Sequence, residues 1–302
     1  GSEMCIRDRV LTIAESNSMN EAAKKLFVSQ PNLSATVREV EEELGITVFM
    51  RNNRGITVTA EGEEFLGYAK QVVEQYHLLE NRYLNVESKK KFSVSMQHYS
   101  FAVKAFVQLA KEVGMDEYEF AVHETKTKEV IDNVKNLKSE IGVLYLSDFN
   151  EKVLRKLFKE CDIEFKELFT CNTYVYLWKK HPLAGKKVIT LDDLQEYPCL
   201  TFEQGVNNSF YYAEEMMSTY EYKRVIKADD RATMLNLMVG LNGFTLCSGI
   251  ISEDLNGDDY AAIPLKESEK MHIGYIKHKG TKLSKLGEIY IDALKNYENK
   301  VL

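Results

Sequence analysis

The chain has 302 residues, enough for about two domains of ordinary size. Hydrophobic residues make up 44% and charged residues 28% of the sequence, which excludes a chain that is disordered throughout. The formal net charge of −7 excludes a basic surface over the whole molecule, so a nucleic-acid site must be a local feature. We predict a cytoplasmic protein without a membrane segment, because the most apolar stretch, 237–251, is too short to span a bilayer and residues 1–10 lack the apolar core of a signal peptide.

Two kinds of pattern divide the sequence near residues 88–91. Before this point every periodic segment is helical, whereas after it short β-rich runs alternate with amphipathic helices, as in α/β domains. We therefore predict a helical domain at 1–60, a linking helix at 61–90 and an α/β domain at 91–302.

The first domain is predicted to contain two helices joined by a tight turn. Ser18 and Ser29 are good N-caps, and Pro31 lies in the first turn of the second helix, where its missing N–H costs nothing. At 100° per residue, the helix 30–44 has one apolar side and one polar side. The apolar side, which must face a core, carries Leu33, Val37, Val40 and Leu44.

Two helices with this turn and a polar outer face are typical of a helix-turn-helix. The outer face and the turn before it offer side chains that can bind phosphate or base edges of double-stranded DNA. The candidate DNA-binding residues of this helix are Ser29, Gln30, Pro31, Asn32, Ser34 and Arg38.

A hairpin is predicted directly after the second helix. Two β-prone runs, 47–49 and 56–58, flank a turn rich in Asn, Arg and Gly. Arg51 and Arg54 are the only charged residues between Gly45 and Ala60. A hairpin in this place is a wing, and we expect both arginines to contact phosphate or the minor groove.

The linking helix carries an apolar seam with alternating spacings of four and three residues, which is typical of a coiled coil. The seam consists of Phe65, Ala69, Val72, Tyr76, Leu79, Tyr83 and Val86. One interpretation is that the stripe covers the core of its own domain. The seam continues too far for that alone, so we favour dimerisation through Phe65, Val72, Tyr76, Leu79 and Tyr83.

The α/β region contains β-rich runs separated by helical patterns. The predicted strands are 92–96, 119–123, 141–146, 165–170, 174–177, 199–202, 225–228, 244–247 and 272–277. The predicted helices include 101–113, 128–137, 209–219, 231–241 and 283–297.

Segment 22–62 resembles the winged helix-turn-helix of LysR-type transcriptional regulators. The resemblance rests on Ala22, Ala23, Leu26, Ser29-Gln30-Pro31, Leu33-Ser34, Glu41, Leu44-Gly45, Phe49, Arg51, Arg54-Gly55, Thr59 and Gly62. His181-Pro182-Leu183-Ala184 and Tyr197-Pro198 are similar to the effector-domain signature of the same family. The resemblance implies a homodimeric or homotetrameric DNA-binding regulator controlled by a small-molecule effector.

The resemblance also implies that the second region folds like type 2 periplasmic binding proteins, with one lobe at 91–162 and 268–302 and another at 163–267. In such sheets ligands lie beyond the carboxyl ends of the strands, where helix N-termini favour polar or anionic molecules. We expect a polar or anionic metabolite there. The candidate effector-binding residues are Gln97, His98, Tyr99, Ser100, Thr125, Tyr145, Thr201, Phe202 and Ser248.

Other functions have less support in the sequence. A solute-binding protein for transport shares the two-lobed fold but has no use for segment 22–62. An enzyme is not expected, because no catalytic constellation or phosphate-binding glycine motif is recognisable. Neither a metal nor another cofactor is expected from the spacing of the six histidines and five cysteines. A redox-sensing regulator that pairs Cys161 with Cys171 stays an alternative.

Overall fold

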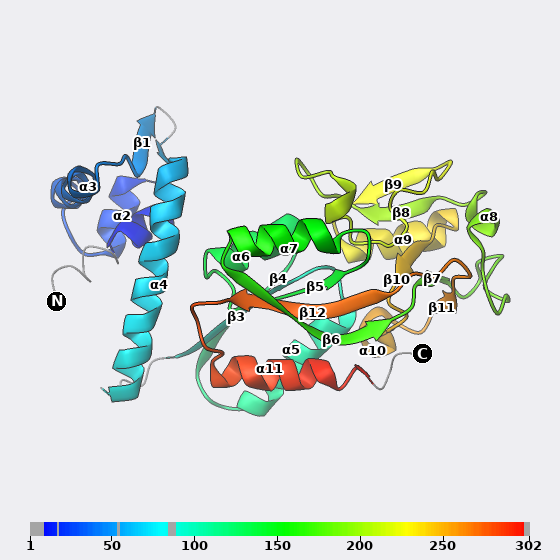
Figure 1. The fold of residues 1–302 in the computed structure, drawn as a ribbon. Helices are drawn as coiled ribbons and strands as arrows, with labels where there is room; N and C mark the ends of the chain where they lie inside the picture. The colour runs from blue at the N-terminus through cyan, green and yellow to red at the C-terminus, as the bar shows by residue number, and fades with distance from the viewer. Residues whose placement is uncertain (1–8, 17, 53–54, 84–88, 299–302) are drawn as a thin grey trace. The chain divides into compact units, whose positions relative to one another are not determined.

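The computed structural model describes residues 9–16, 18–52, 55–83 and 89–298, without the side chains of residues 51, 52 and 80–83 (Figure 1). The chain divides into two compact units, 1–88 and 89–302. In the described part of the chain, no helix is long and apolar enough to cross a membrane.

The first unit is helical apart from one hairpin. After helical residues 9–14, its elements are α2 (Met19–Lys25), α3 (Gln30–Leu44), β1 (Phe49–Asn52), β2 (Gly55–Val58) and α4 (Ala60–Tyr83). The Ser18 hydroxyl accepts a hydrogen bond from the Glu21 amide at 3.2 Å, and the Ser29 hydroxyl accepts one from the Asn32 amide at 3.4 Å. Both predicted N-caps are therefore confirmed.

The apolar side of α3 packs on the small residues of α2. Leu33, Val37 and Val40 are buried in one core with Ala22 and Ala23. The prediction for Leu44 was wrong, because this side chain is 47% exposed. The helix ends there: Gly45 adopts a left-handed φ of 68°, which favours glycine and turns the chain away from the core.

The hairpin is confirmed, with its first strand two residues later than predicted. β1 and β2 pair antiparallel, with Phe49 opposite Val58. The Glu41 carboxylate accepts hydrogen bonds from the amides of Val48 (2.7 Å) and Phe49 (3.0 Å). This carboxylate of α3 therefore satisfies two backbone donors at the entry to the hairpin and holds the hairpin against α3.

The larger lobe of the second unit is built on a five-stranded sheet of order β4-β3-β5-β12-β6. Its strands are β3 (Lys90–Met96), β4 (Tyr118–Glu124), β5 (Ile141–Leu146), β6 (Ile163–Cys171) and β12 (Met271–His278). β3 runs parallel to β4 and β5, whereas β12 is antiparallel to both of its neighbours. All residues of β5 are buried, as expected for a strand covered on both faces.

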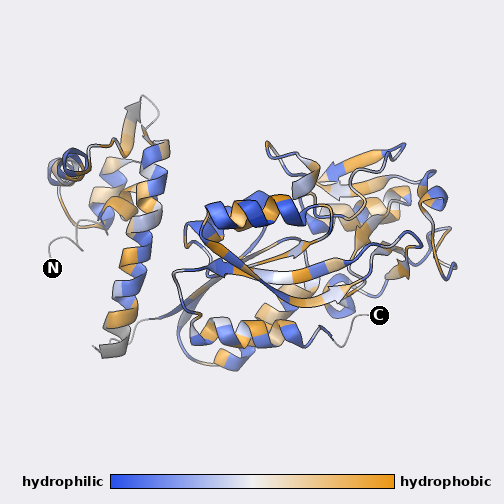
Figure 2. Cartoon of the chain, in the orientation of Figure 1, coloured by the Kyte–Doolittle hydropathy of each residue, from blue (hydrophilic) through white to orange (hydrophobic). Residues whose placement is uncertain are grey.

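Helices cover both faces of this sheet (Figure 1). They are α5 (Ser100–Val113) and α11 (Lys285–Lys295) on one face, and α6 (Thr127–Lys135) and α7 (Glu151–Glu160) on the other. Figure 2 shows hydrophobic and hydrophilic residues alternating along these helices, which matches one buried and one exposed side.

The smaller lobe contains the three-stranded sheet β10-β7-β11 and the parallel pair β8-β9. Its elements are β7 (Tyr174–Trp178), α8 (Leu191–Leu194), β8 (Cys199–Phe202), η1 (Phe210–Tyr212), β9 (Val225–Ala228), α9 (Arg231–Leu241), β10 (Thr245–Cys247), α10 (Glu253–Asn256) and β11 (Tyr260–Pro264). Strand β11, which pairs with β7, was not predicted from the sequence.

Two predictions for this unit need correction. The lobe boundary predicted at 163 lies after Cys171 instead, because β6 pairs with β12 in the larger sheet. The helix predicted at 209–219 is reduced to the short η1. There, the backbone carbonyls of Tyr212 and Ala213 accept hydrogen bonds from side chains of the larger lobe, which replaces the bonds of a regular helix.

Candidate functional site

The candidate DNA-binding residues of the first unit lie together on the outer side of α3 and at its N-cap. Ser29, Pro31, Asn32 and Arg38 are exposed. Gln30 and Ser34 are half-buried, and the Gln30 amide donates a hydrogen bond to the Ser34 hydroxyl at 3.0 Å. Of the two wing arginines, Arg51 lies in β1 with its side chain outside the described part, and Arg54 lies outside the described residues altogether.

The helix α4 changes character along its length. Ala69 and Val73 are buried, and Phe65 packs against the core of the first unit. Further along, Val72, Tyr76 and Leu79 are 38%, 37% and 55% exposed in the single chain. Tyr83 ends α4 with a side chain that is not described, and Val86 lies outside the described residues. The far part of the seam thus presents apolar surface that its own unit does not cover.

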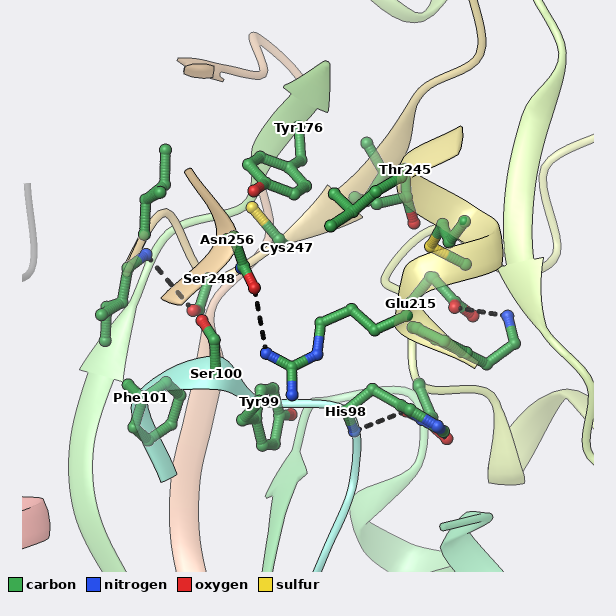
Figure 3. Close-up of a pocket in the computed structure, with 18 of the residues that line it drawn as sticks. His98, Tyr99, Ser100, Phe101, Tyr176, Glu215, Thr245, Cys247, Ser248 and Asn256 are labelled. Carbon is green, nitrogen blue, oxygen red and sulfur yellow. Dashed lines mark hydrogen bonds and ion pairs between the residues drawn. The ribbon is translucent and has the colours of Figure 1, made fainter. Parts of the chain in front are cut away.

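In the second unit a pocket lies between the two lobes (Figure 3). His98 to Phe101, at the start of α5, line it from the larger lobe. The smaller lobe supplies Phe202 of β8, Met234 and Met238 of α9, and strand β10. Together with the open solvent space at its mouth, the empty space of the pocket is about 730 Å³.

Five of the nine candidate effector-binding residues line this pocket, and four do not. The five are His98, Tyr99, Ser100, Phe202 and Ser248. The other four, which are not among the residues lining this pocket, are Gln97, Thr125, Tyr145 and Thr201.

Hydrogen bonds explain where most of these four residues point. The buried Gln97 amide donates to the Thr127 hydroxyl at 2.7 Å and accepts from the Tyr145 amide at 3.2 Å. Tyr145 lies within β5, and its hydroxyl donates to the Ala213 carbonyl at 3.0 Å. Thr125 donates to Glu129 at the start of α6. These residues support the backbone around the pocket and connect the lobes.

An ion pair crosses from one lobe to the other beside the pocket. Arg231, the first residue of α9, binds both carboxylate oxygens of Glu124 at the end of β4, at 2.9 and 2.5 Å. Its third contact is the Asn256 side-chain oxygen, at 3.3 Å. Sequence reasoning missed this pair because Arg231 and Glu124 lie 107 residues apart and no periodic pattern connects them.

Two adjacent acids of the smaller lobe are buried at the pocket wall. Glu214 accepts hydrogen bonds from the backbone amide of His98 at 3.0 Å and from its ring Nδ1 at 2.8 Å. Glu215 accepts one from the Phe202 amide at 2.8 Å. The His98 ring also stacks on Phe202, with 3.7 Å between ring centroids. The loop before α5 is thereby bound to the smaller lobe.

This environment shifts the pKa of two groups. Burial, together with the nearby charge of Glu214, raises the pKa of Glu215 to about 8. Burial lowers the pKa of His98, but the hydrogen bond and charge of Glu214 and the charge of Glu124 raise it by more, so its pKa lies above the ordinary value. At neutral pH Glu215 is therefore mostly uncharged.

The cysteines of the described chain are all free. Cys161 is the C-cap of α7, and Cys171 is the last residue of the nine-residue strand β6 that follows. At 3.3 Å per residue the strand alone separates the two ends by about 26 Å, far beyond disulfide reach. Burial raises the pKa of both thiols, which disfavours the reactive thiolate. The fold therefore does not support a switch between Cys161 and Cys171.

Comparison with known proteins identifies the family. A model described as bacterial regulatory helix-turn-helix protein, lysR family, matches residues 10–63, and one described as LysR substrate binding domain matches residues 115–298. The chain belongs to the LysR family. The predicted winged helix-turn-helix and two-lobed α/β domain are confirmed as its fold class, and the chain is a DNA-binding transcriptional regulator with an effector-binding domain.

Individual relatives extend over most of this LysR-type chain. The regulator CysL of Bacillus subtilis is 25% identical over 304 residues, which cover 97% of each chain. TdcA of Escherichia coli is 21% identical over 300 residues, covering 95% of this chain and 90% of TdcA.

Two full-length structures share the fold. OxyR C199D of Pseudomonas aeruginosa aligns with a TM-score of 0.70 at 17% identity, over 97% of this chain and 94% of that one. LysG of Corynebacterium glutamicum with bound effector Arg aligns with a TM-score of 0.63 at 13% identity, over 99% of each chain. At these identities the structures support the fold alone.

Proposed function

We propose that this LysR-type regulator binds double-stranded DNA as a homodimer or a tetramer, and that a small molecule in the pocket between the lobes controls this binding. The observation that carries the proposal is a pocket lined by both lobes of one domain, in a chain whose other domain is a winged helix-turn-helix. Its place of action is then the cytoplasm, where bacterial DNA lies.

The proposed DNA contacts are the outer side of α3 and the hairpin. The N-terminus of α3 points backbone amides outward, and Arg38 adds a positive charge on the same exposed side. Arg51 and Arg54 are the proposed phosphate or minor-groove contacts of the wing. A single small domain of this kind binds weakly, so pairing through α4 brings two such surfaces to one DNA duplex.

The proposed control follows from the position of the pocket. The side chains that close it belong to both lobes, and Arg231 with Glu124 and Glu214 with His98 already connect the lobes there. A ligand that contacts both lobes stabilises one arrangement of them over others, by as much as its affinities for the arrangements differ.

Selection of duplexes from a random library with the full chain tests the DNA-binding proposal. We expect enriched sequences with two half-sites about one helical turn, or a multiple of it, apart. Enrichment of single half-sites only would contradict paired binding. For the effector, a metabolite that raises the melting temperature of the chain should lose this effect in Leu235→Trp, which fills the pocket from a half-buried position of α9.

A further inference from the structure

Three ionisable side chains meet beside the pocket, where the two lobes join. His98 belongs to the loop before α5 in the larger lobe, whereas Glu214 and Glu215 follow η1 in the smaller lobe. The side chains of His98 and Glu214 are 6% and 5% exposed, and Glu215 is 6% exposed. All three line the pocket, and Figure 3 shows His98 and Glu215 there. Two acids and one histidine are therefore buried together at a contact that exists only while the lobes meet in this arrangement.

The two acids of this cluster differ in their partners. Glu214 accepts hydrogen bonds from the His98 ring at 2.8 Å and the His98 amide at 3.0 Å, and a third from the Gln204 side chain at 3.1 Å. Glu215 accepts hydrogen bonds from backbone amides only, including that of Phe202, and forms no ion pair among the described residues. Because neighbouring carboxylates repel each other strongly when buried, Glu215, which has no charged partner, holds a proton.

Within the described part of the chain, the other ionisable groups that face the cluster keep one charge state near neutral pH. Burial raises the pKa of the hydroxyls and the thiol that face the two acids, so they stay protonated; these are Tyr99, Tyr145, Cys199 and Tyr222. Glu124 and Arg231 act on the pKa of His98 in opposite directions and are bound to each other. Hydrogen bonds from the first turn of α9 lower the pKa of Asp230, which also lies near His98, so Asp230 stays charged. A proton exchanged here near neutral pH therefore belongs to the cluster itself.

Separation of the lobes changes the number of protons that the cluster binds. In contact with water, the Glu215 carboxyl returns toward its ordinary pKa of 4.5 and releases its proton at neutral pH. His98 loses Glu214 as its partner, so its raised pKa falls back toward the ordinary 6.5. Both groups therefore hold more protons while the lobes meet than when they are apart. By linkage, contact between the lobes is favoured at low pH and weakens as the pH rises toward 8.

We propose that His98, Glu214 and Glu215 form a pH-sensitive contact that couples the arrangement of the two lobes to the uptake of protons. At neutral pH the lobes come together with uptake of about one proton at Glu215 and a fraction of one at His98. This inference rests on the proposed function, in which the arrangement of the lobes controls DNA binding. A rise in pH then opposes a ligand that holds both lobes together.

Hydrogen exchange of the full chain tests this coupling through an amide that connects the lobes. The buried Thr127 amide of the larger lobe donates to the Gln204 side chain of the smaller lobe at 3.1 Å, so it exchanges when this contact opens. The Gln97 amide is the internal control, because it donates to the Val143 carbonyl within the larger lobe. Exchange rates at pH 6, 7 and 8 are divided by the rates of the unstructured chain at the same pH, which gives the protection of each amide.

The expected result is lower protection of Thr127 than of Gln97, with a fall at Thr127 of about ten-fold from pH 6 to 7. In Glu215→Gln this fall should be about three-fold at most, which is the part that His98 contributes. The exposed Glu221→Gln is the matched control and should keep the wild-type fall. Protection of Thr127 that does not change with pH, or that falls as steeply in Glu215→Gln as in the wild type, would overturn the proposal. Equal protection of Thr127 and Gln97 at every pH would overturn it as well, because the lobes would then separate only on unfolding.

This experiment separates the inference from the proposed function on which it rests. No effector enters the exchange measurement, so its failure rejects the pH-sensitive contact and leaves the pocket as the proposed effector site. The proposed function fails instead if the metabolites that stabilise the chain do so equally in Leu235→Trp. In that case a pH-dependent exchange of Thr127 that Glu215→Gln reduces still supports the coupling between protons and lobes.

Discussion

The DNA-binding unit and the effector unit differ in how their candidate functional residues are distributed along the chain. The proposed DNA contacts come from one stretch, Ser29 to Arg54, and most belong to a single helix. The pocket combines residues from His98 to Met271 that lie on separate strands and helices. A surface that belongs to one helix follows from its periodicity, whereas a pocket follows from the packing of distant elements.

The largest expected effect concerns the seam, where a function was inferred from periodicity alone. Leu79→Glu places a carboxylate in the proposed dimer contact, and symmetry doubles the cost of burying it. We expect the dimer to dissociate at least 100-fold more readily, with a matching loss of DNA affinity. Sedimentation and gel shifts measure both quantities.

Leu78→Glu is the matched control for the seam. Leu78 and Leu79 are 54% and 55% exposed, but Leu78 lies outside the seam. Its variant should remain dimeric. An intact dimer for Leu79→Glu, or equal dissociation of both variants, would contradict pairing along the seam.

The next expected effect distinguishes the wing from α3. Replacing Arg51 and Arg54 with Ala removes two proposed phosphate contacts, so DNA affinity should fall at least ten-fold on specific and random duplexes alike. The slope of log K against log salt should become shallower by about 2. Arg38→Ala, by contrast, should weaken specific binding more than random binding, because α3 is proposed to read bases. An unchanged salt slope in the double variant would refute the wing contacts.

A smaller effect is expected at the ion pair between the lobes. Glu124→Gln leaves the partly buried Arg231 without its charge partner, which should lower the free energy of unfolding of the effector unit by about 1–3 kcal/mol. The double variant with Arg231→Gln should recover part of this loss. Trp178 is the single tryptophan of the chain, so its fluorescence during a urea titration measures the unfolding of the effector unit.

Lys104→Gln is the matched control for that pair. Lys104 and Asp254 also connect the two lobes, but their side chains are 34% and 59% exposed. This substitution should cost less than about 1 kcal/mol. A cost equal to that of Glu124→Gln would mean that burial does not set the strength of these contacts.

The smallest effect concerns pH. The folded pKa of Glu215 is about 8, above its ordinary value of 4.5, so the folded protein holds a proton that the unfolded chain releases. The free energy of unfolding should therefore fall as pH rises from about 4.5 to 8, by at most about 1.4 kcal/mol per pH unit. Glu215→Gln should remove this slope while its oxygen still accepts from Phe202. Urea unfolding at pH 6 and 7 measures the difference, and the exposed Glu221→Gln should keep the wild-type slope.

Several features of both units could be predicted from particular residues. The caps Ser18 and Ser29, the buried positions Leu33 and Val37, and the hairpin all depend on neighbours within a few residues. His98 and Ser100 were placed at the pocket because the strand before α5 ends there. Local sequence patterns were sufficient to predict these features, because contacts between residues close in the chain determine them.

Other features depended on contacts between distant residues. The segment 209–219 has a helical pattern, but the carbonyls of Tyr212 and Ala213 and the Glu214 carboxylate bind the opposite lobe, so only η1 remains helical. Gln97 and Tyr145 were expected in the pocket, yet their side chains satisfy buried polar groups beside it. At these positions hydrogen bonds to distant residues override the local sequence pattern, because a buried polar group must find a partner.

The sequence by itself determined the family, the helix-turn-helix with its outer face, and the apolar seam, because each depends on spacing along one segment. Only the tertiary structure showed that Arg231 binds Glu124 and that Glu214 binds the amide and ring of His98 from the opposite lobe. Contacts of this kind depend on strand order and register across two lobes. The spacing of residues within one segment therefore cannot predict them.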